Sequence, residues 1–463
     1  MRHGGCPQHP GRALVDIFRH GSYKEHCFFQ DACELSEAIK IGRHVLKNNA
    51  LPKLAWIIAG LLLFSTMINY ADRLTLAVLI TDIRKALTLD ERDYSHIVSI
   101  FLFAYAIMYA VSGYVVDRLG TKRGFAVFVF GWSVSQMLHG LATGKWSLAG
   151  CRFLLGATEP GNFPAAVKAI QEWFPASRRA LGVGIFNAGS SIGAAIASPM
   201  AAFIALRYGW RAPFLFTGAL GLVWLICWLL IYYTPGDTPG GGAEVERRAE
   251  PPTSSWKVFV SRPCVALMLA RFFSDPVIYF VNFWLPAYLQ KERGYNLAMV
   301  GRYAWVPYVF GGIGYLAGGW VSGKLIERGW SVMKARKTIM LVGACLMPAA
   351  IAAPLVPSAQ AAIAAICVVT FGHAIWIANL LTLPADLFPR NQVGTSTGFS
   401  GMAGSVGGIL ANLATGYVIA KFTYLPLFVV AGLMHPLAII LVLVLLREKS
   451  GTGCRVESPA PAC

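Results

Sequence analysis

Charged residues are scarce in this sequence. They make up 14% of its 463 residues, whereas hydrophobic residues make up 56%. A water-soluble globular chain does not combine these values, because its surface in water needs more charge. Hydrophobic runs follow one another closely from Leu54 to Leu446 and leave no room for a large aqueous domain. The sequence therefore indicates a protein whose surroundings are mostly lipid.

The sequence also lacks the residue spacings that are typical of metal sites and catalytic sites. Ten cysteines are scattered along the chain, and none forms a close pair typical of a metal or redox site. No loop carries paired carboxylates or metal-spaced histidines, which disfavours a polytopic membrane enzyme and predicts no metal or cofactor. A channel or a receptor would need a polar ring along a pore or a large sensing domain, and the sequence has neither.

Residues 1–50 contain no apolar stretch. They mix histidine, cysteine and charged residues, so they form neither a signal peptide nor a transmembrane span. Two interpretations stay open: a cytoplasmic tail over residues 1–53, or a start assigned too far upstream. The second would need an alternative initiation codon near Val45 or Leu51, since no methionine lies between Met1 and Met67.

Twelve segments have the apolar length, about 20 residues, that a helix needs to cross a bilayer. They are residues 55–80, 94–116, 124–142, 148–171, 180–205, 212–233, 264–290, 299–326, 337–356, 359–383, 394–420 and 424–446. A polar stretch rich in proline and glycine separates the sixth segment from the seventh and predicts a flexible linker. We expect an all-α polytopic membrane protein with these parts: two six-helix bundles at 54–233 and 263–447, a linker at 234–262 and a tail at 448–463.

Positive charge is unevenly distributed between the two sides of this arrangement. Lysine and arginine are more frequent in the loops on the side of the linker than in the opposite loops. The positive-inside rule then places both termini and the linker in the cytoplasm. The net charge of +17 is thereby explained without nucleic-acid binding.

The two predicted bundles contain a repeated pattern. Glu172-Trp173-Phe174-Pro175 recurs as Asp386-Leu387-Phe388-Pro389, and at equal spacing Gly184, Ser191 and Gly193 match Gly398, Ser405 and Gly407. Helices four and five therefore resemble helices ten and eleven. Parallel repeats of this kind place a binding site midway through the bilayer, between the two halves.

A tight loop joins the second and third predicted helices and combines glycines, an acid and basic residues. The residues concerned are Gly113, Asp117, Arg118, Gly120, Lys122 and Arg123. Charges in such a loop can form a latch that holds neighbouring helices in one conformation, although ordinary positive charge on the cytoplasmic side is the alternative. The loop resembles the signature of the major facilitator superfamily, whereas its counterpart in the second half has Gly323 where an acid is usual.

Helix one contains two ionisable residues, Asp72 and Arg73, near the middle of its span. Charges at this depth are costly and are functional candidates. Arg73 can bind a substrate carboxylate through two parallel hydrogen bonds. Asp72 can neutralise Arg73 when the site is empty, or it can accept a proton. A structural ion pair, or a pair at the end of the helix, is the alternative.

Helix four contains Arg152 and Glu159, which are seven residues apart and therefore lie on one helical face. Pro160 follows Glu159 and removes a helical hydrogen bond. A carboxylate desolvated at this position is expected to bind and release protons near neutral pH. Arg152 either pairs with Glu159 or lies at the membrane interface.

The motif Asn-Tyr-x-Asp-Arg in helix one and the motif Arg-x₆-Glu-Pro in helix four resemble the anion:cation symporter family, most closely its bacterial hexuronate transporters. The resemblance extends from Lys53 to Arg447. It implies an organic-anion site lined by Tyr70, Arg73 and Tyr105, to which we add Tyr279 of helix seven. It also implies that Asp72 and Glu159 are the proton-coupling carboxylates, with Arg152 as a charge partner.

Helix ten carries His373, Trp376 and Asn379 at intervals of three residues, similar to a motif of hexuronate carriers. This spacing puts them on one helical face, where they suit hydrogen bonds with sugar hydroxyls and stacking on a sugar ring. Packing residues without a substrate role are the alternative.

The resemblance implies a function. We expect a secondary transporter of the bacterial inner membrane that imports a small organic anion with protons, by alternating access. A hexuronate such as galacturonate or glucuronate is the expected substrate, with aldarates, tartrate-like dicarboxylates and aromatic acids as alternatives. The expected partners are the substrate, protons and the lipid bilayer, and the expected functional unit is a monomer.

Overall fold

The computed structural model describes residues 52–235, 255–295 and 297–446. The C-terminal tail, residues 1–51 of the predicted N-terminal tail and residues 236–254 of the predicted linker lie outside these residues. Regular secondary structure in the described part of the chain is helical, which confirms the predicted all-α fold class.

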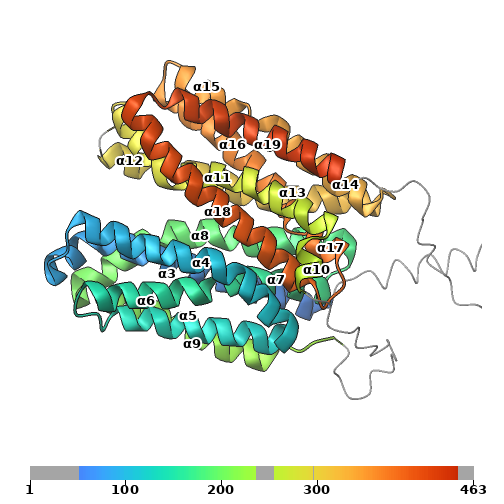
Figure 1. The fold of residues 1–463 in the computed structure, drawn as a ribbon, viewed down its shortest axis with the longest axis horizontal. Coiled ribbons are helices and arrows are strands. Elements are labelled where there is room, and N and C mark those ends of the chain that lie inside the picture. The colour runs from blue at the N-terminus through green and yellow to red at the C-terminus, as the bar shows by residue number, and fades with distance from the viewer. Residues whose placement is uncertain (1–51, 236–254, 296, 447–463) are drawn as a thin grey trace, which may run out of the picture. The chain divides into compact units, whose positions relative to one another are not determined.

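The helices form two bundles, drawn in blue to green and in yellow to red in Figure 1. The first half contains α3 (Lys53–Leu87), α4 (Glu91–Leu119), α5 (Thr121–His139), α6 (Lys145–Thr158), the 3-10 turn η1 (Glu159–Gly161), α7 (Asn162–Trp173), α8 (Ala176–Tyr208) and α9 (Ala212–Ile231). The second half contains α10 (Ser255–Phe259), α11 (Arg262–Lys291), α12 (Leu297–Tyr303), α13 (Val306–Glu327), α14 (Val332–Leu346), α15 (Ala349–Leu355), α16 (Ala359–Leu380), α17 (Leu383–Leu387), α18 (Val393–Lys421) and α19 (Leu425–Leu445).

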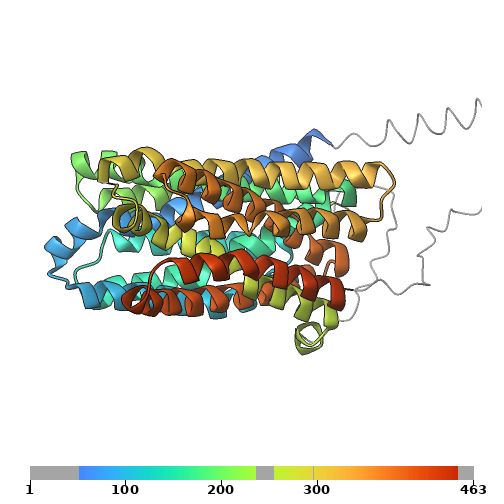
Figure 2. The same ribbon diagram turned by 90° about the horizontal axis from the view of Figure 1, so that it is seen from above.

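Nine stretches of the described chain are long and apolar enough to cross a membrane. The predicted spans 124–142, 148–171 and 299–326 are also helical but are not among the nine. The helix over the first, α5, has Lys122 and Arg123 at its start, the second is interrupted by η1, and the third is divided between α12 and α13. The helix order is consistent with twelve spans, and Figure 2 shows long helices running side by side.

The predicted repeat has the same backbone geometry in both halves. Phe174 ends α7 with φ −117° and ψ 132°, and Phe388 ends α17 with φ −118° and ψ 147°. Both residues are extended because the proline that follows each of them disfavours the helical region. The chain therefore turns in the same way before α8 and before α18.

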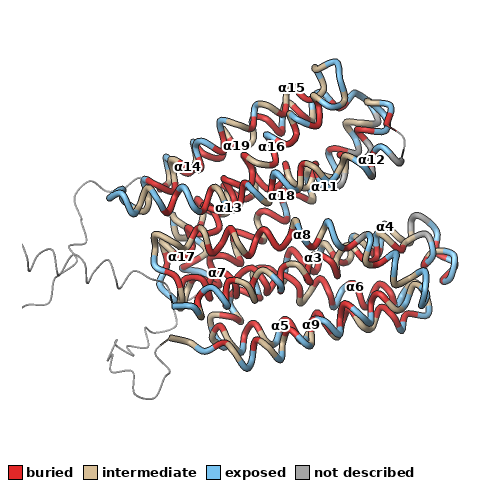
Figure 3. Tube along the Cα trace, turned by 180° about the vertical axis from the view of Figure 1, so that it is seen from behind, coloured by how far each residue is buried: buried red, intermediate tan, exposed pale blue. Residues whose placement is uncertain are grey.

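The halves meet along two helix pairs, α8 with α13 and α4 with α18. Small residues allow this approach. A Cβ atom on Gly113 of α4 would lie 2.1 Å from the carbonyl oxygen of Gly394, and one on Gly323 of α13 would lie 2.3 Å from that of Ser177. Gly323 thus has a physical reason to replace the usual acid, because a larger side chain would collide with α8. Figure 3 shows the buried residues along these inward faces.

We call the end of the molecule at which α9 ends and α10 begins the linker end. The turn from α4 to α5 and the starts of α8 and α18 lie there (Figure 1). Each half also has its own hydrophobic core near the opposite end, around Phe214 in the first half and around Tyr288 and Phe428 in the second.

Candidate functional site

An ion pair between Arg73 of α3 and Glu159 of η1 forms the centre of the candidate site. The Nε and Nη2 atoms of Arg73 donate to Oε2 of Glu159 over 3.1 and 3.0 Å. Glu159 is fully buried, whereas 22% of the Arg73 side chain is exposed. Pro160 cannot donate a backbone hydrogen bond, so the helix tightens into η1 at this point and presents Glu159 to α3.

Polar side chains of α3 fix the position of η1. Asn69 donates from Nδ2 to the main-chain oxygen of Glu159 over 3.3 Å, and its Oδ1 accepts from Arg73 over 3.5 Å. One turn earlier, the Ser65 hydroxyl donates to Asn162 over 2.9 Å. These buried bonds hold the carboxylate in reach of the guanidinium, so the site is preorganised.

The side chain of Asp72 points away from that of Arg73, because the side chains of adjacent helical residues are about 100° apart around the helix axis. It is fully buried inside the first half, and its carboxylate oxygens have no hydrogen-bond partner within normal length in the described structure. The side chain of Thr217 is near this carboxylate, and Glu159 is within electrostatic range. Arg73 is therefore neutralised by Glu159 in this structure and not by Asp72, the partner considered from the sequence.

Arg152 is buried beside this pair rather than at the membrane interface, with 3% of its surface exposed. Its Nη2 donates to the main-chain oxygen of Arg73 over 3.5 Å, and its guanidinium lies 5.5 Å from the centre of the Phe101 ring. Of the two alternatives left open by the sequence, the structure has neither a direct pair of Arg152 with Glu159 nor an interfacial Arg152: Glu159 pairs with Arg73, and Arg152 is within electrostatic range of Glu159.

Aromatic rings surround the exposed side of Arg73. The guanidinium carbon lies 5.0 Å from the ring centre of Tyr70 and 4.6 Å from that of Tyr105. Tyr279 comes from α11 of the other half and is within electrostatic range of Arg73. Tyr70, Arg73 and Tyr105, which the resemblance places together, are thus close in space, and Tyr279, which we added to them, is near the same guanidinium. A cation framed by rings and phenol groups can bind a carboxylate and pack against a sugar ring.

A second buried ion pair, which the sequence reasoning missed as a site, lies in α11. Arg271 donates from Nε and Nη2 to Oδ2 of Asp275, and the distances are 2.7 and 2.6 Å. Both residues are more than nine-tenths buried. Opposite charges four residues apart inside a predicted span were the available signal.

The predicted trio on helix ten lies among helices of the second half. His373 and His435 of α19 approach to 3.1 Å between ring nitrogens, and the Trp376 ring meets the His435 ring edge to face. Asn379 donates to the main-chain oxygen of Gly318 on α13 over 3.2 Å. The three side chains share a buried region, and these contacts are the packing interactions that the sequence reasoning held as the alternative to substrate binding.

Asp117 of the predicted latch joins the two halves at the linker end. Its carboxylate accepts from the backbone N–H of Gly394 over 3.0 Å and from the N–H and hydroxyl of Thr395 over 2.6 and 2.7 Å. Lys168 of α7 pairs with the same carboxylate at 2.8 Å. An acid at the start of α18 also interacts favourably with the helix dipole.

The other latch residues have different positions. Arg118 lies over the Tyr114 ring of its own helix at 5.0 Å and is exposed, as is Arg123, while Lys122 is half-buried. Gly120 has φ +77° and forms the turn between α4 and α5. The bonds that connect the halves at this loop therefore come from Asp117.

A second set of charges joins the halves beside Asp117. Asp386 of α17 pairs with Arg179 of α8 and with Arg336 of α14, both at 3.0 Å. Gln171 of α7 adds hydrogen bonds to the main-chain oxygens of Ala385 and Phe388 over 3.0 and 3.1 Å. Asp386 is the repeat partner of Glu172, and it supplies the acid that is missing at Gly323.

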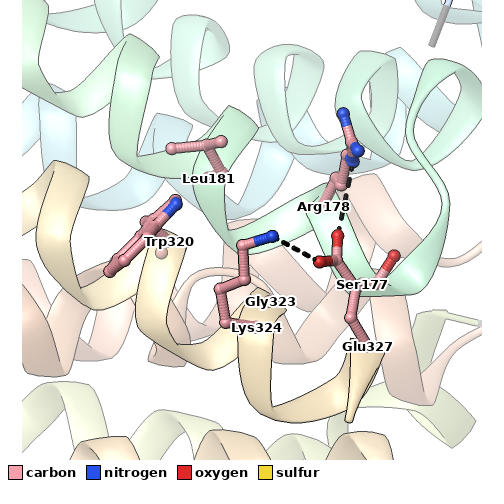
Figure 4. A pocket seen from close by; sticks show the side chains of 8 residues that line it. Ser177, Arg178, Leu181, Trp320, Gly323, Lys324 and Glu327 are labelled. Carbon is pink, nitrogen blue, oxygen red and sulfur yellow. Dashed lines mark hydrogen bonds and ion pairs between the residues drawn. The ribbon is translucent and has the colours of Figure 1, made fainter. Parts of the chain in front are cut away.

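A pocket of about 190 Å³ lies between α8 and α13 at the linker end (Figure 4). Glu327 in this pocket approaches Arg178 of α8 to 3.7 Å and Lys324 of its own helix to 2.8 Å. The pocket is lined by Ser177, Arg178, Leu181, Gly319, Trp320, Gly323, Lys324 and Glu327. The pair of Arg178 and Glu327 is part of the contact between the halves.

Replacing Asp117 by asparagine is expected to weaken closure at the linker end. The change removes the negative charge that accepts from Gly394, Thr395 and Lys168, which we expect to cost about 1.4 kcal/mol or more. A single cysteine placed at Ser396, which is buried near this contact, should then react with an alkylating reagent about tenfold faster.

Asp90→Asn is the matched control for this measurement. Asp90 caps α4 through a bond to the backbone of Asp93 and does not join the halves. Its substitution should leave the alkylation rate of the cysteine at Ser396 unchanged. Equal rates in Asp117→Asn and in the unsubstituted latch would show that Asp117 does not hold this end closed.

Known proteins resemble this chain over most of its length. The family model of the Major Facilitator Superfamily matches residues 62–412 and, separately, residues 335–458. A hexuronate transporter of Escherichia coli K12 is 32% identical over 426 residues, which cover 88% of this chain and 98% of that protein. A galacturonate transporter of Dickeya chrysanthemi is 34% identical over 308 residues, which cover 64% of this chain and 89% of that protein.

Solved structures share the fold. A major facilitator superfamily transporter, FucP, in the outward conformation has a TM-score of 0.67 at 16% identity, with 86% of this chain and 100% of that chain covered. The proton:xylose symporter XylE has a TM-score of 0.66 at 15% identity, with coverage of 84% and 95%. Because the family model spans most of the chain and the Escherichia coli relative matches almost end to end, this multi-pass membrane protein belongs to the major facilitator superfamily.

Proposed function

We propose that this protein imports a hexuronate together with protons by alternating access. The proposal rests on the surroundings of Arg73. This cation is partly exposed, its counter-ion is the protonatable Glu159, and its neighbours come from both halves. The relatives support the substrate class, since they include transporters named for hexuronate, galacturonate and D-galactonate. Others are named as probable galactarate/D-glucarate transporters, so aldarates are the nearest alternative.

Competition for Arg73 couples the proton to the substrate in this proposal. When Glu159 is ionised, it occupies the Nε and Nη2 donors of Arg73. A proton on Glu159 removes the charge that holds this pair, and the substrate carboxylate then takes the same donors with the bidentate geometry that a guanidinium favours. Substrate binds tightly only after the proton, which is the order that symport requires.

Asp72 provides a second place for a proton. The buried charges of Asp72, Arg73, Arg152 and Glu159 sum to zero when both acids are ionised, so each proton bound makes room for one negative charge of the substrate. A negative cell interior opposes anion entry by about 2.3 kcal/mol per charge per 100 mV. One proton per monoanion cancels this opposition, and two protons let the potential drive uptake.

The contacts at the linker end define the proposed conformational cycle. Both termini and the linker lie in the cytoplasm of a bacterial cell in this proposal, so the bonds of Asp117 and Asp386 close the cytoplasmic side. Substrate enters from the outside, the halves rock, and these bonds break to release it inward. A single chain contains both halves of the site and is the functional unit.

Uptake by proteoliposomes with an acidic exterior tests the proposal. We expect concentrative uptake of galacturonate or glucuronate that a protonophore abolishes, and weaker uptake of glucarate and tartrate. Vesicles without the pH gradient are the control. If no carboxylate accumulates under the gradient, the proposed function is wrong.

A further inference from the structure

The ion pair of Arg271 and Asp275 is unusual in its position. Both residues lie in α11, one helical turn apart and inside a membrane span. Two nitrogens of Arg271 bind the same oxygen of Asp275 at 2.7 and 2.6 Å. A charged pair at this depth is costly to bury and is weak evidence for stability alone.

The pair faces the boundary between the halves rather than the interior of the second half. The Arg271 guanidinium lies 5.8 Å from the ring centre of Tyr109, which belongs to α4 of the first half. Glycines of α18 leave the space for these side chains. A Cβ atom on Gly404 would lie 2.1 Å from Oδ2 of Asp275, and one on Gly401 would lie 2.1 Å from Cε1 of Tyr109.

Two tyrosines connect this pair with the carboxylate-binding end of the site. The rings of Tyr109 and Tyr105 meet edge to face with centres 5.5 Å apart, and Tyr105 lies 4.6 Å from the Arg73 guanidinium. Tyr279 of α11 is within electrostatic range of both Arg73 and Asp275. Arg73 and Arg271 are thus at opposite ends of one row of aromatic side chains.

At the Arg271 end of this row, two polar groups can still form hydrogen bonds. Nη1 of Arg271 and the hydroxyl of Tyr109 are buried and close to each other, and neither forms a hydrogen bond of normal geometry in the described structure. Buried polar groups in folded proteins are nearly always satisfied, so unsatisfied donors beside a proposed substrate site indicate groups that bind a ligand.

The pair is also expected to stay neutral during transport. Arg271 and Asp275 are on the same helix, so movement of the halves does not separate them, whereas the pair of Arg73 and Glu159 joins different helices. The distances within the α11 pair are shorter as well. A neutral pair can accept from and donate to hydroxyl groups, but it offers no net charge to a second carboxylate.

We propose that Arg271, Asp275 and Tyr109 bind the hydroxyl groups at the end of the sugar acid that is remote from the carboxylate at Arg73. This inference rests on the proposed function and adds a basis for specificity. Asp275 accepts from sugar hydroxyls, while Arg271 and Tyr109 donate to them. Because Asp275 neutralises Arg271, the site selects acids with one carboxylate over aldarates, in which the remote end is a second carboxylate.

Asp275→Asn tests this selection. The variant leaves Arg271 with an uncompensated charge, which favours a second carboxylate. Glucuronate and glucarate are the probes, because glucarate has a second carboxylate at the remote carbon, where glucuronate has the hemiacetal of its sugar ring. We expect the ratio of kcat/KM for uptake of glucuronate to that of glucarate to fall about tenfold or more in proteoliposomes. Asp82→Asn, which changes an exposed carboxylate of α3 in the same way, should keep the ratio of the unsubstituted protein.

An unchanged or higher ratio in Asp275→Asn would overturn the inference. If that variant transports neither probe, Tyr109→Phe decides, because it removes only one hydroxyl. We then expect the KM for glucuronate to rise several-fold, roughly three- to tenfold, with the maximal rate unchanged. An unchanged KM would overturn the inference. Failure of the proposed function is distinct, since the unsubstituted protein would then accumulate neither probe.

Discussion

Replacing Arg73 by lysine is expected to reduce uptake of every carboxylate substrate by about 30-fold or more. Lysine keeps the positive charge but loses the planar fork that binds a carboxylate through two bonds. It also loses the two donors that bind Oε2 of Glu159 at 3.1 and 3.0 Å, so a buried carboxylate is left poorly paired. Losses of about 2 to 5 kcal/mol are usual when one partner of a buried charge pair is changed. Uptake of labelled glucuronate at a fixed pH gradient measures the effect.

Arg207→Lys is the matched control for Arg73→Lys. Arg207 lies near the end of α8, where it is exposed and stacks on Phe203. The same chemical change there should leave uptake within about twofold of the unsubstituted protein, as is usual for exposed sites. If Arg73→Lys transports as well as Arg207→Lys, the guanidinium of Arg73 is not the substrate's partner.

Replacing Glu159 by glutamine is expected to separate substrate binding from proton coupling. Glutamine resembles the protonated carboxyl group, so Arg73 no longer has a charged competitor for the substrate carboxylate. Exchange of substrate across the membrane should therefore continue at all pH values. Accumulation driven by a pH gradient should fall strongly, because the proton that competes with the substrate for Arg73 has lost its site and only Asp72 remains.

Two assays on the same vesicles measure this separation. Counterflow of labelled glucuronate reports exchange, and uptake under an imposed gradient reports coupling. Glu292→Gln, an exposed change at the end of α11, should behave as the unsubstituted protein in both. Full pH-dependent accumulation by Glu159→Gln would show that Glu159 is not the coupling carboxylate.

The membrane spans and the charged residues of the first half could both be predicted from the sequence. Lipid requires long apolar helices, and each charge within them stands out against that background. Asp72, Arg73 and Glu159 were found in this way, and Pro160 explained the break at η1. These inferences use only local composition and the chemistry of single residues.

The pairing of these charges could not be predicted, because it depends on which helical faces meet. Arg73 and Asp72 are adjacent in sequence, yet Arg73 pairs with Glu159 across two helices and Asp72 points into the first half. Asp386 and Arg336 are likewise distant in sequence and form their contact only after α14 and α17 pack together. A single sequence contains no signal that tells which residues distant in sequence will form an ion pair.

The pair in α11 was missed for a different reason. Arg271 and Asp275 lie in the predicted span 264–290, whereas the family resemblance drew attention to the charged motifs of helices one and four. The spacing of four residues between opposite charges was a local signal and could have been used. Its position beside Tyr109 of the other half, however, depends on the close approach of α4, α11 and α18.

Proton uptake on substrate binding shows whether Glu159 and the substrate compete for Arg73. Purified protein in weakly buffered solution is mixed with saturating glucuronate at neutral pH, and the pH change is recorded. Competition between Glu159 and the substrate for Arg73 predicts that protons are taken up as substrate binds, and that Glu159→Gln takes up fewer. Binding of glucuronate without any proton uptake, or with equal uptake in Glu159→Gln, would contradict the account.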